Sequence, residues 1–102
     1  MQVIVDASGQ VKLEDLDDFR SFQVTLSNEI SYKTLETVID AVGRLDGESS
    51  AWIRETALRK LGRDDPVWQE KLTGMIGFAA RRGWTDPATG DIRAHIVGSI
   101  RG

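Results

Sequence analysis

His95 is the only histidine in the sequence, and histidine is the side chain that most readily changes charge near neutral pH. A role as catalytic base would require a serine nucleophile and an orienting carboxylate, but the sequence contains no Gly-x-Ser-x-Gly motif. In the alternating segment around it, His95 shares one face with Arg93 and Val97, opposite three apolar residues. We expect this face to meet solvent or a partner, and we assign no catalytic residue. A pocket near His95 that binds a small molecule or supports an enzymatic reaction is a minor alternative.

Four carboxylates lie close together at Glu14, Asp15, Asp17 and Asp18, and clustered oxygen ligands are what a hard cation prefers. The cluster lacks the glycine and distal glutamate of a calcium-binding loop, so we interpret it as a solvated acidic connection. The absence of cysteine excludes thiolate sites, and a single histidine excludes a multi-histidine site within one chain. No glycine-rich phosphate loop occurs either. The sequence therefore predicts no metal and no cofactor.

Charge and aromatic content suggest an interaction protein. Residues 1–49 carry four basic and ten acidic side chains, whereas the remainder of the chain has a net positive charge. The chain also contains three tryptophans, at positions 52, 68 and 84, and aromatic side chains are enriched in interface cores. We therefore favour a small, non-enzymatic interaction or accessory protein that acts by self-association or by binding another protein.

The candidate interaction surface lies in the C-terminal part of the chain and comprises Trp84, Ile92, Arg93, His95 and Ile96. A terminal strand after the Asp86–Gly90 turn could pair at a sheet edge with its own symmetry mate and form a homodimer. The short apolar run at the N-terminus resembles neither a signal peptide nor a membrane span. We expect a soluble, cytoplasmic protein with no membrane association.

The elements that would position these residues can be predicted from periodicity. Alternating apolar residues predict strands at 2–6, 10–13, 22–26 and 92–96, the first two forming a hairpin. Helical spacing predicts helices at 31–45, 51–61 and 66–82. We therefore predict one domain spanning residues 1–102, of α+β class. Its small antiparallel sheet, made of the N-terminal strands plus a C-terminal strand, would pack against three helices.

Capping residues define the helix ends most clearly. Ser31 is a good N-cap, and Asp65 followed by Pro66 is the strongest helix start in the chain. Gly83 is suited to end the third helix. Two glycines lie inside that helix, Gly74 and Gly77, and they could permit a close backbone approach or form the floor of a small pocket. The alternative is that they have no special role, because tertiary packing often overrides the low helix propensity of glycine.

A winged helix-turn-helix is the main alternative, because a helix, a short glycine-containing turn, a second helix and a turn-bearing pair of strands follow in that order. Arg93 and His95 would then lie on the wing. However, Asp64 and Asp65 would occupy the helix N-terminus that approaches phosphate, and affinity for DNA depends largely on lysine and arginine. Nucleic-acid binding is therefore disfavoured.

Overall fold

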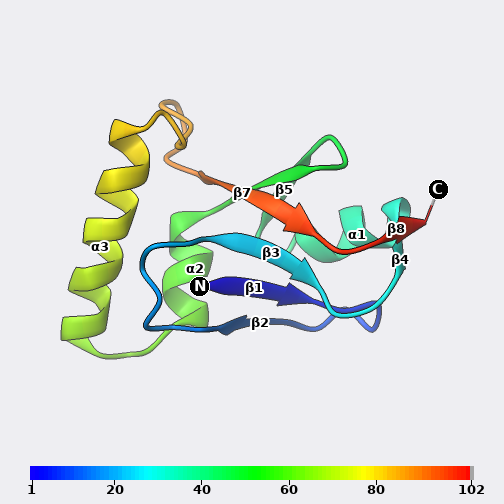
Figure 1. Cartoon of the computed structure of the whole chain (residues 1–102), viewed down its shortest axis with the longest axis horizontal. Helices are drawn as coiled ribbons and strands as arrows, with labels where there is room; N and C mark the ends of the chain where they lie inside the picture. Colours follow the sequence, from blue (N-terminus) through cyan, green and yellow to red (C-terminus); the bar gives the residue numbers. More distant parts are fainter. Residues whose placement is uncertain (102) are drawn as a thin grey trace.

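The computed structural model describes residues 1–101, and its main element is a curled, six-stranded mixed sheet (Figure 1). The order across the sheet is β2 (Val11–Glu14), β1 (Gln2–Val5), β3 (Gln23–Leu26), β7 (Ile92–Val97), β6 (Ser50–Ile53) and β5 (Gly43–Asp46). The prediction of a small antiparallel sheet is therefore wrong.

The sheet is mixed because the chain reverses direction twice between β1 and β3. β1 and β2 form the expected antiparallel hairpin, so β2 ends beside the beginning of β1, and residues 15–22 then cross to the other side of β1, where β3 begins. β3 consequently runs parallel to β1, and β7 runs parallel to β3. The alternation of apolar residues is the same in parallel and antiparallel strands, so it could not distinguish these arrangements.

The second correction concerns residues 43–53, which we predicted to be mostly helical. The first helix, α1 (Tyr32–Ile39), ends before Leu45, and β5 and β6 form an antiparallel hairpin. Gly47 lies in its turn with φ of 72°, a conformation that suits glycine. At Gly43 a Cβ atom would lie 1.8 Å from the Trp52 carbonyl oxygen, so glycine is needed for the two strands to approach. Tertiary pairing here outweighs the helical spacing of the apolar residues.

The predicted N-caps of the first and third helices are confirmed. The Ser31 side chain accepts a hydrogen bond from the Thr34 amide, and that of Asp65 accepts one from the Val67 amide. α2 (Glu55–Leu61) and α3 (Pro66–Arg81) follow, and Gly83 has the positive φ typical of a residue after a helix. A separate parallel pair, β4 (Ile30–Ser31) and β8 (Ile100–Arg101), joins the start of α1 to the end of the described chain.

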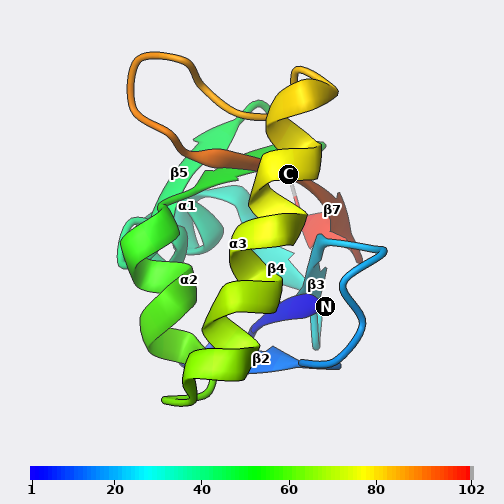
Figure 2. The same cartoon turned by 90° about the vertical axis from the view of Figure 1, so that its left-hand side faces the viewer.

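The core lies between one face of the sheet and the helices. α1 and α2 lie behind the sheet in Figure 1, and Figure 2 shows α3 crossing one end of it. Trp68 of α3 is buried, and its Nε1 donates a hydrogen bond of 2.8 Å to the Leu16 carbonyl oxygen. Alternate strand residues, such as Val24, Ala94 and Ile96, point into this core. The opposite face of β7 is left uncovered by helices.

Candidate binding site beside the open face of the sheet

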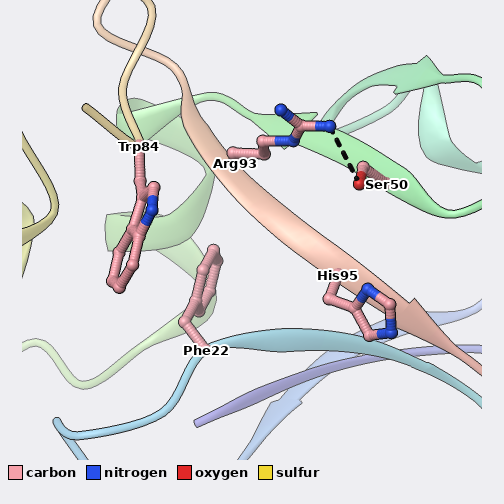
Figure 3. Close-up of a pocket in the computed structure, with 5 residues that line it drawn as sticks. All are labelled: Phe22, Ser50, Trp84, Arg93 and His95. Carbon is pink, nitrogen blue, oxygen red and sulfur yellow. Dashed lines mark hydrogen bonds between the residues drawn. The ribbon is translucent and has the colours of Figure 1, made fainter. Parts of the chain in front are cut away.

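A pocket of about 390 Å³ lies against the uncovered face of β7 (Figure 3). It is lined by Phe22, Ser50, Trp84, Arg93 and His95. Phe22 directly precedes β3, Ser50 begins β6, and Trp84 follows α3. Three distant parts of the chain therefore meet at this pocket. The volume lies within the range usual for ligand pockets, about 300–1,000 Å³.

Strand register brings the polar lining residues together. Along β7 the apolar side chains point into the core, which leaves Arg93 and His95 on the open face. Ser50 is the cross-strand partner of His95, and Trp52 is the partner of Arg93. The open face of β6 and β7 therefore carries hydroxyl, imidazole, indole and guanidinium groups side by side.

A narrower apolar recess of about 90 Å³ adjoins this pocket, and Phe22, Trp84 and Arg93 line both. Its remaining wall includes Phe19 from the segment before β3 and Met75 and Phe78 from α3. The Trp84 and Phe78 side chains are 49% and 45% exposed, although large aromatic rings are usually mostly buried. Their ring centroids lie 6.2 Å apart in an edge-on arrangement. Together, Phe19, Phe22, Phe78 and Trp84 form what we call the aromatic recess.

Two arginine side chains stack on aromatic rings in or beside the site. The guanidinium carbon of Arg93 lies 5.9 Å from the Trp52 ring centre and that of Arg82 lies 5.0 Å from the Phe78 ring centre. Arg93 also contacts the Asp46 carboxylate at 3.5 Å and the Ser50 hydroxyl at 3.4 Å. These contacts orient the guanidinium group of Arg93 while leaving its side chain half exposed.

A second arginine organises the neighbouring carboxylates. Arg44 stacks on Trp52 at 5.5 Å and forms ion pairs with Asp91 and, at 2.9 Å, with Asp86. The hydrogen bond from the Ala88 amide is the main cause that lowers the pKa of Asp86 below its usual range. Burial opposes this effect less strongly, and Arg44 adds a further lowering. The acids beside the site are therefore paired within the chain.

The structure divides the interaction surface expected from the sequence. Trp84, Arg93 and His95 meet at the pocket, whereas Ile92 and Ile96 are only 2% and 7% exposed and belong to the core. Ile92 reaches the site only as part of the wall of the narrow recess.

Sequence reasoning missed several lining residues, including Phe22, Ser50 and Phe78. Phe22 fitted an ordinary residue of the strand predicted at 22–26, and Ser50 directly precedes the helix predicted at 51–61. A signal was available at Phe78, because it falls outside the buried stripe of α3 formed by Trp68, Leu72 and Ala79. An exposed aromatic ring at such a position is a reason to expect a contact surface.

β7 has no free edge, because β3 pairs with one side of it and β6 with the other. The strand cannot form the edge-to-edge dimer that we expected through it. It also does not form a freestanding wing, since the segment after α3 leads directly into the middle of the sheet. The two glycines of α3 do not line the pocket: a Cβ at Gly74 would meet nothing within 4 Å, and one at Gly77 only the Arg81 guanidinium.

The acidic segment before β3 has separate partners rather than a common centre. Asp17 pairs with Arg63 at 2.7 Å, Asp15 accepts a hydrogen bond from Gln2, and Asp18 lies 3.8 Å from the N-terminal amine. Within residues 1–101, no group of three or more histidine, cysteine, aspartate or glutamate side chains is arranged to hold a metal ion.

Comparison with protein-family models, with curated proteins and with solved structures gives no match. Among the described residues, no helix has the length and apolar character needed to cross a membrane.

Proposed function

We propose that this chain is a non-enzymatic interaction module that binds a segment of another protein at the aromatic recess and the adjoining pocket. The observation that carries the proposal is the exposure of Trp84 and Phe78, which contact each other beside a ready-formed cavity. Exposed apolar clusters rimmed by polar groups are typical of interaction sites, and aromatic anchors dominate the binding energy of many interfaces. The cytoplasm, which the sequence predicts, remains the proposed location.

A partner protein is favoured over a second copy of the chain because the strand expected to mediate a dimer is interior to the sheet. Ile92 and Ile96, which would have supplied apolar contact area, are already buried in the core. Self-association remains a measurable alternative, and light scattering at tens of micromolar protein would reveal it.

Binding is favoured over catalysis because the described residues do not form a proton-transfer chain. Within residues 1–101, no hydrogen bond or ion pair joins His95 to a carboxylate, and the Ser50 hydroxyl instead accepts a hydrogen bond from Arg93. A nucleophilic serine requires a base that is itself oriented by a third group. The pocket offers contact groups but no such set.

Nucleic-acid binding receives no support from α3. Its first turn is preceded by Asp64 and by the capping Asp65, so acids occupy the end that would approach phosphate. Duplex DNA binding of micromolar strength at about 150 mM salt, weakening steeply as salt rises, would contradict the proposal and favour the nucleic-acid alternative.

The direct test is selection of short random peptides displayed on phage against the wild-type protein and two variants. We expect Trp84→Ala to abolish enrichment, because it removes the ring shared by both cavities. Val67→Ala is the matched control, since Val67 is also an exposed apolar residue but lies at the opposite end of α3. It should leave enrichment unchanged.

Two results would overturn the proposed function. The first is no enrichment over an unrelated protein of similar size. The second is enrichment that persists in Trp84→Ala while circular dichroism shows that the variant is folded.

A further inference from the structure

We infer that the partner segment is acidic, with a carboxylate next to the aromatic or branched apolar side chain that enters the recess. This inference rests on the proposed function and specifies the chemistry of the partner. It follows from the charges around the aromatic rings rather than from the rings themselves.

Positive groups surround the recess although the whole chain has a net charge of −3. Arg20 and Arg93 line the recess directly, and Arg82 stacks on its Phe78 ring. Neither Arg20 nor Arg82 forms a side-chain ion pair within residues 1–101. An acidic chain thus places three arginines around its most exposed aromatic side chains, and of these only Arg93 has an ion-pair partner among residues 1–101.

The nearby acids do not cancel this charge. Asp86 and Asp91 are paired with Arg44 on the far side of Trp52, and Asp91 is also buried. Asp46 contacts Arg93 at 3.5 Å, a separation that is longer than a good charge-assisted hydrogen bond. Asp18 lies beside the recess as well, but its carboxylate accepts hydrogen bonds from the Arg20 amide and the Ser21 hydroxyl and lies 3.8 Å from the N-terminal amine. The three arginines around the recess outnumber Asp18 and Asp46, so the charge that a ligand would meet in the recess is positive.

Arg93 is built to receive a carboxylate. Its guanidinium plane stacks on Trp52, a cross-strand neighbour, and its contacts with Asp46 and Ser50 use a single nitrogen, Nη2. A stacked guanidinium keeps its other N–H groups available at its edge. The planar fork of arginine matches the two oxygens of a carboxylate, and pre-positioning reduces the entropy lost on binding. Because Arg93 lines both cavities, a carboxylate bound there lies next to an apolar side chain in the recess.

The test uses the peptides selected on the wild-type protein, synthesised with a fluorescent label and measured by fluorescence polarisation. We expect aspartate or glutamate beside an aromatic or branched apolar residue. Replacing those acids by asparagine or glutamine should weaken binding about two- to fivefold per charge, the effect typical of exposed ion pairs. Raising the salt concentration from about 50 to 500 mM should weaken the binding of the acidic peptides but not the binding of their neutral versions.

Variants of the protein test which arginines contact the acidic side chains of the peptide. Arg93→Gln and Arg82→Gln should each lower affinity for the acidic peptide about two- to fivefold more than they lower affinity for its neutral version, since only the acidic peptide loses a charge contact. Lys33→Gln removes one positive charge from α1, away from the recess, and should have no effect beyond a small change in salt dependence.

The possible outcomes separate this inference from the proposed function. Selected peptides that are neutral or basic, and that still depend on Trp84, overturn the acidic partner but retain the interaction module. Acidic peptides whose affinity does not respond to Arg93→Gln or Arg82→Gln overturn the inference as well. A selection that enriches no peptide overturns both.

Discussion

The guanidinium carbon of Arg93 lies 5.9 Å from the ring centre of Trp52, its cross-strand partner. The contact depends on the antiparallel register of β6 and β7, which places both side chains on the uncovered face of the sheet. Arg44 stacks on the same indole ring, so one tryptophan supports two cations. Trp52 thereby links the binding site to the ion pairs beyond it.

This relationship predicts an energetic coupling between the two residues. Trp52→Leu, Arg93→Gln and the double variant should show a coupling of about 0.5–1 kcal/mol in a double-mutant cycle, the usual strength of an exposed cation–π contact. Urea denaturation supplies the four unfolding free energies. Additive effects would show that the side chains lie close together without stabilising each other.

Two glycines should respond to alanine in opposite ways. Gly43→Ala should destabilise the protein by about 1–3 kcal/mol or more, because its Cβ would overlap the Trp52 carbonyl oxygen and force the hairpin apart. Gly74→Ala should stabilise it by about 0.5–1 kcal/mol, because the site is open and lies inside α3. Thermal melting measures both changes in stability. Equal melting temperatures for the two variants would contradict the opposite effects expected at Gly43 and Gly74.

The inward stripe of α1 can be tested at Val38 and Ile39, which are both buried. Alanine at either position should reduce stability by about 2–4 kcal/mol through lost apolar transfer free energy and lost packing. Thr37→Ala is the control, since Thr37 is exposed and bonds only to the preceding turn of the helix. Unchanged denaturation midpoints in both buried variants would show that this face of α1 does not support the core.

β7 offers a test of its two faces at neighbouring positions. Ile96→Asp should prevent folding at any salt concentration, because it places an unpaired charge in the core. Val97→Asp should leave the protein folded, since Val97 is exposed on the open face. Circular dichroism distinguishes the outcomes. A folded Ile96→Asp protein that only changes oligomeric state in light scattering would restore the dimer surface expected from the sequence.

Acid should destabilise the protein partly through Asp86. The pKa of this carboxyl is lowered in the folded state, by the Ala88 amide first and then by Arg44, so the folded protein binds the proton more weakly than the unfolded chain. Its stabilising contribution is therefore present above about pH 4 and is lost as pH falls through the lowered pKa.

Asp86→Asn should consequently reduce the drop in melting temperature between pH 7 and about pH 3. The drop should not vanish, because the pKa values of Asp6 and Asp18 are lowered as well, chiefly by the hydroxyls of Ser8 and Ser21. An identical pH dependence in the variant and the wild-type protein would contradict the role of Asp86.

Several features could be predicted from the sequence because they depend on neighbouring residues alone. The β1–β2 hairpin, the capping of α1 by Ser31 and of α3 by Asp65, and the alternation along β7 are all local. The same alternation placed Arg93 and His95 correctly on one face. In each case, a few consecutive side chains determine the outcome.

The tertiary structure decided which strands pair, and it brought Phe22, Ser50 and Trp84 together in one pocket. Residues 43–53 form a hairpin because Gly43 admits the Trp52 carbonyl and β7 provides the next strand for β6 to pair with. The parallel pairing of β3 with β1 and β7 depends on the path of the whole chain. Strand direction and long-range contacts leave no trace in local periodicity, because a pleated strand alternates in the same way whichever neighbours it has. The aromatic recess therefore exists only once the sheet has assembled.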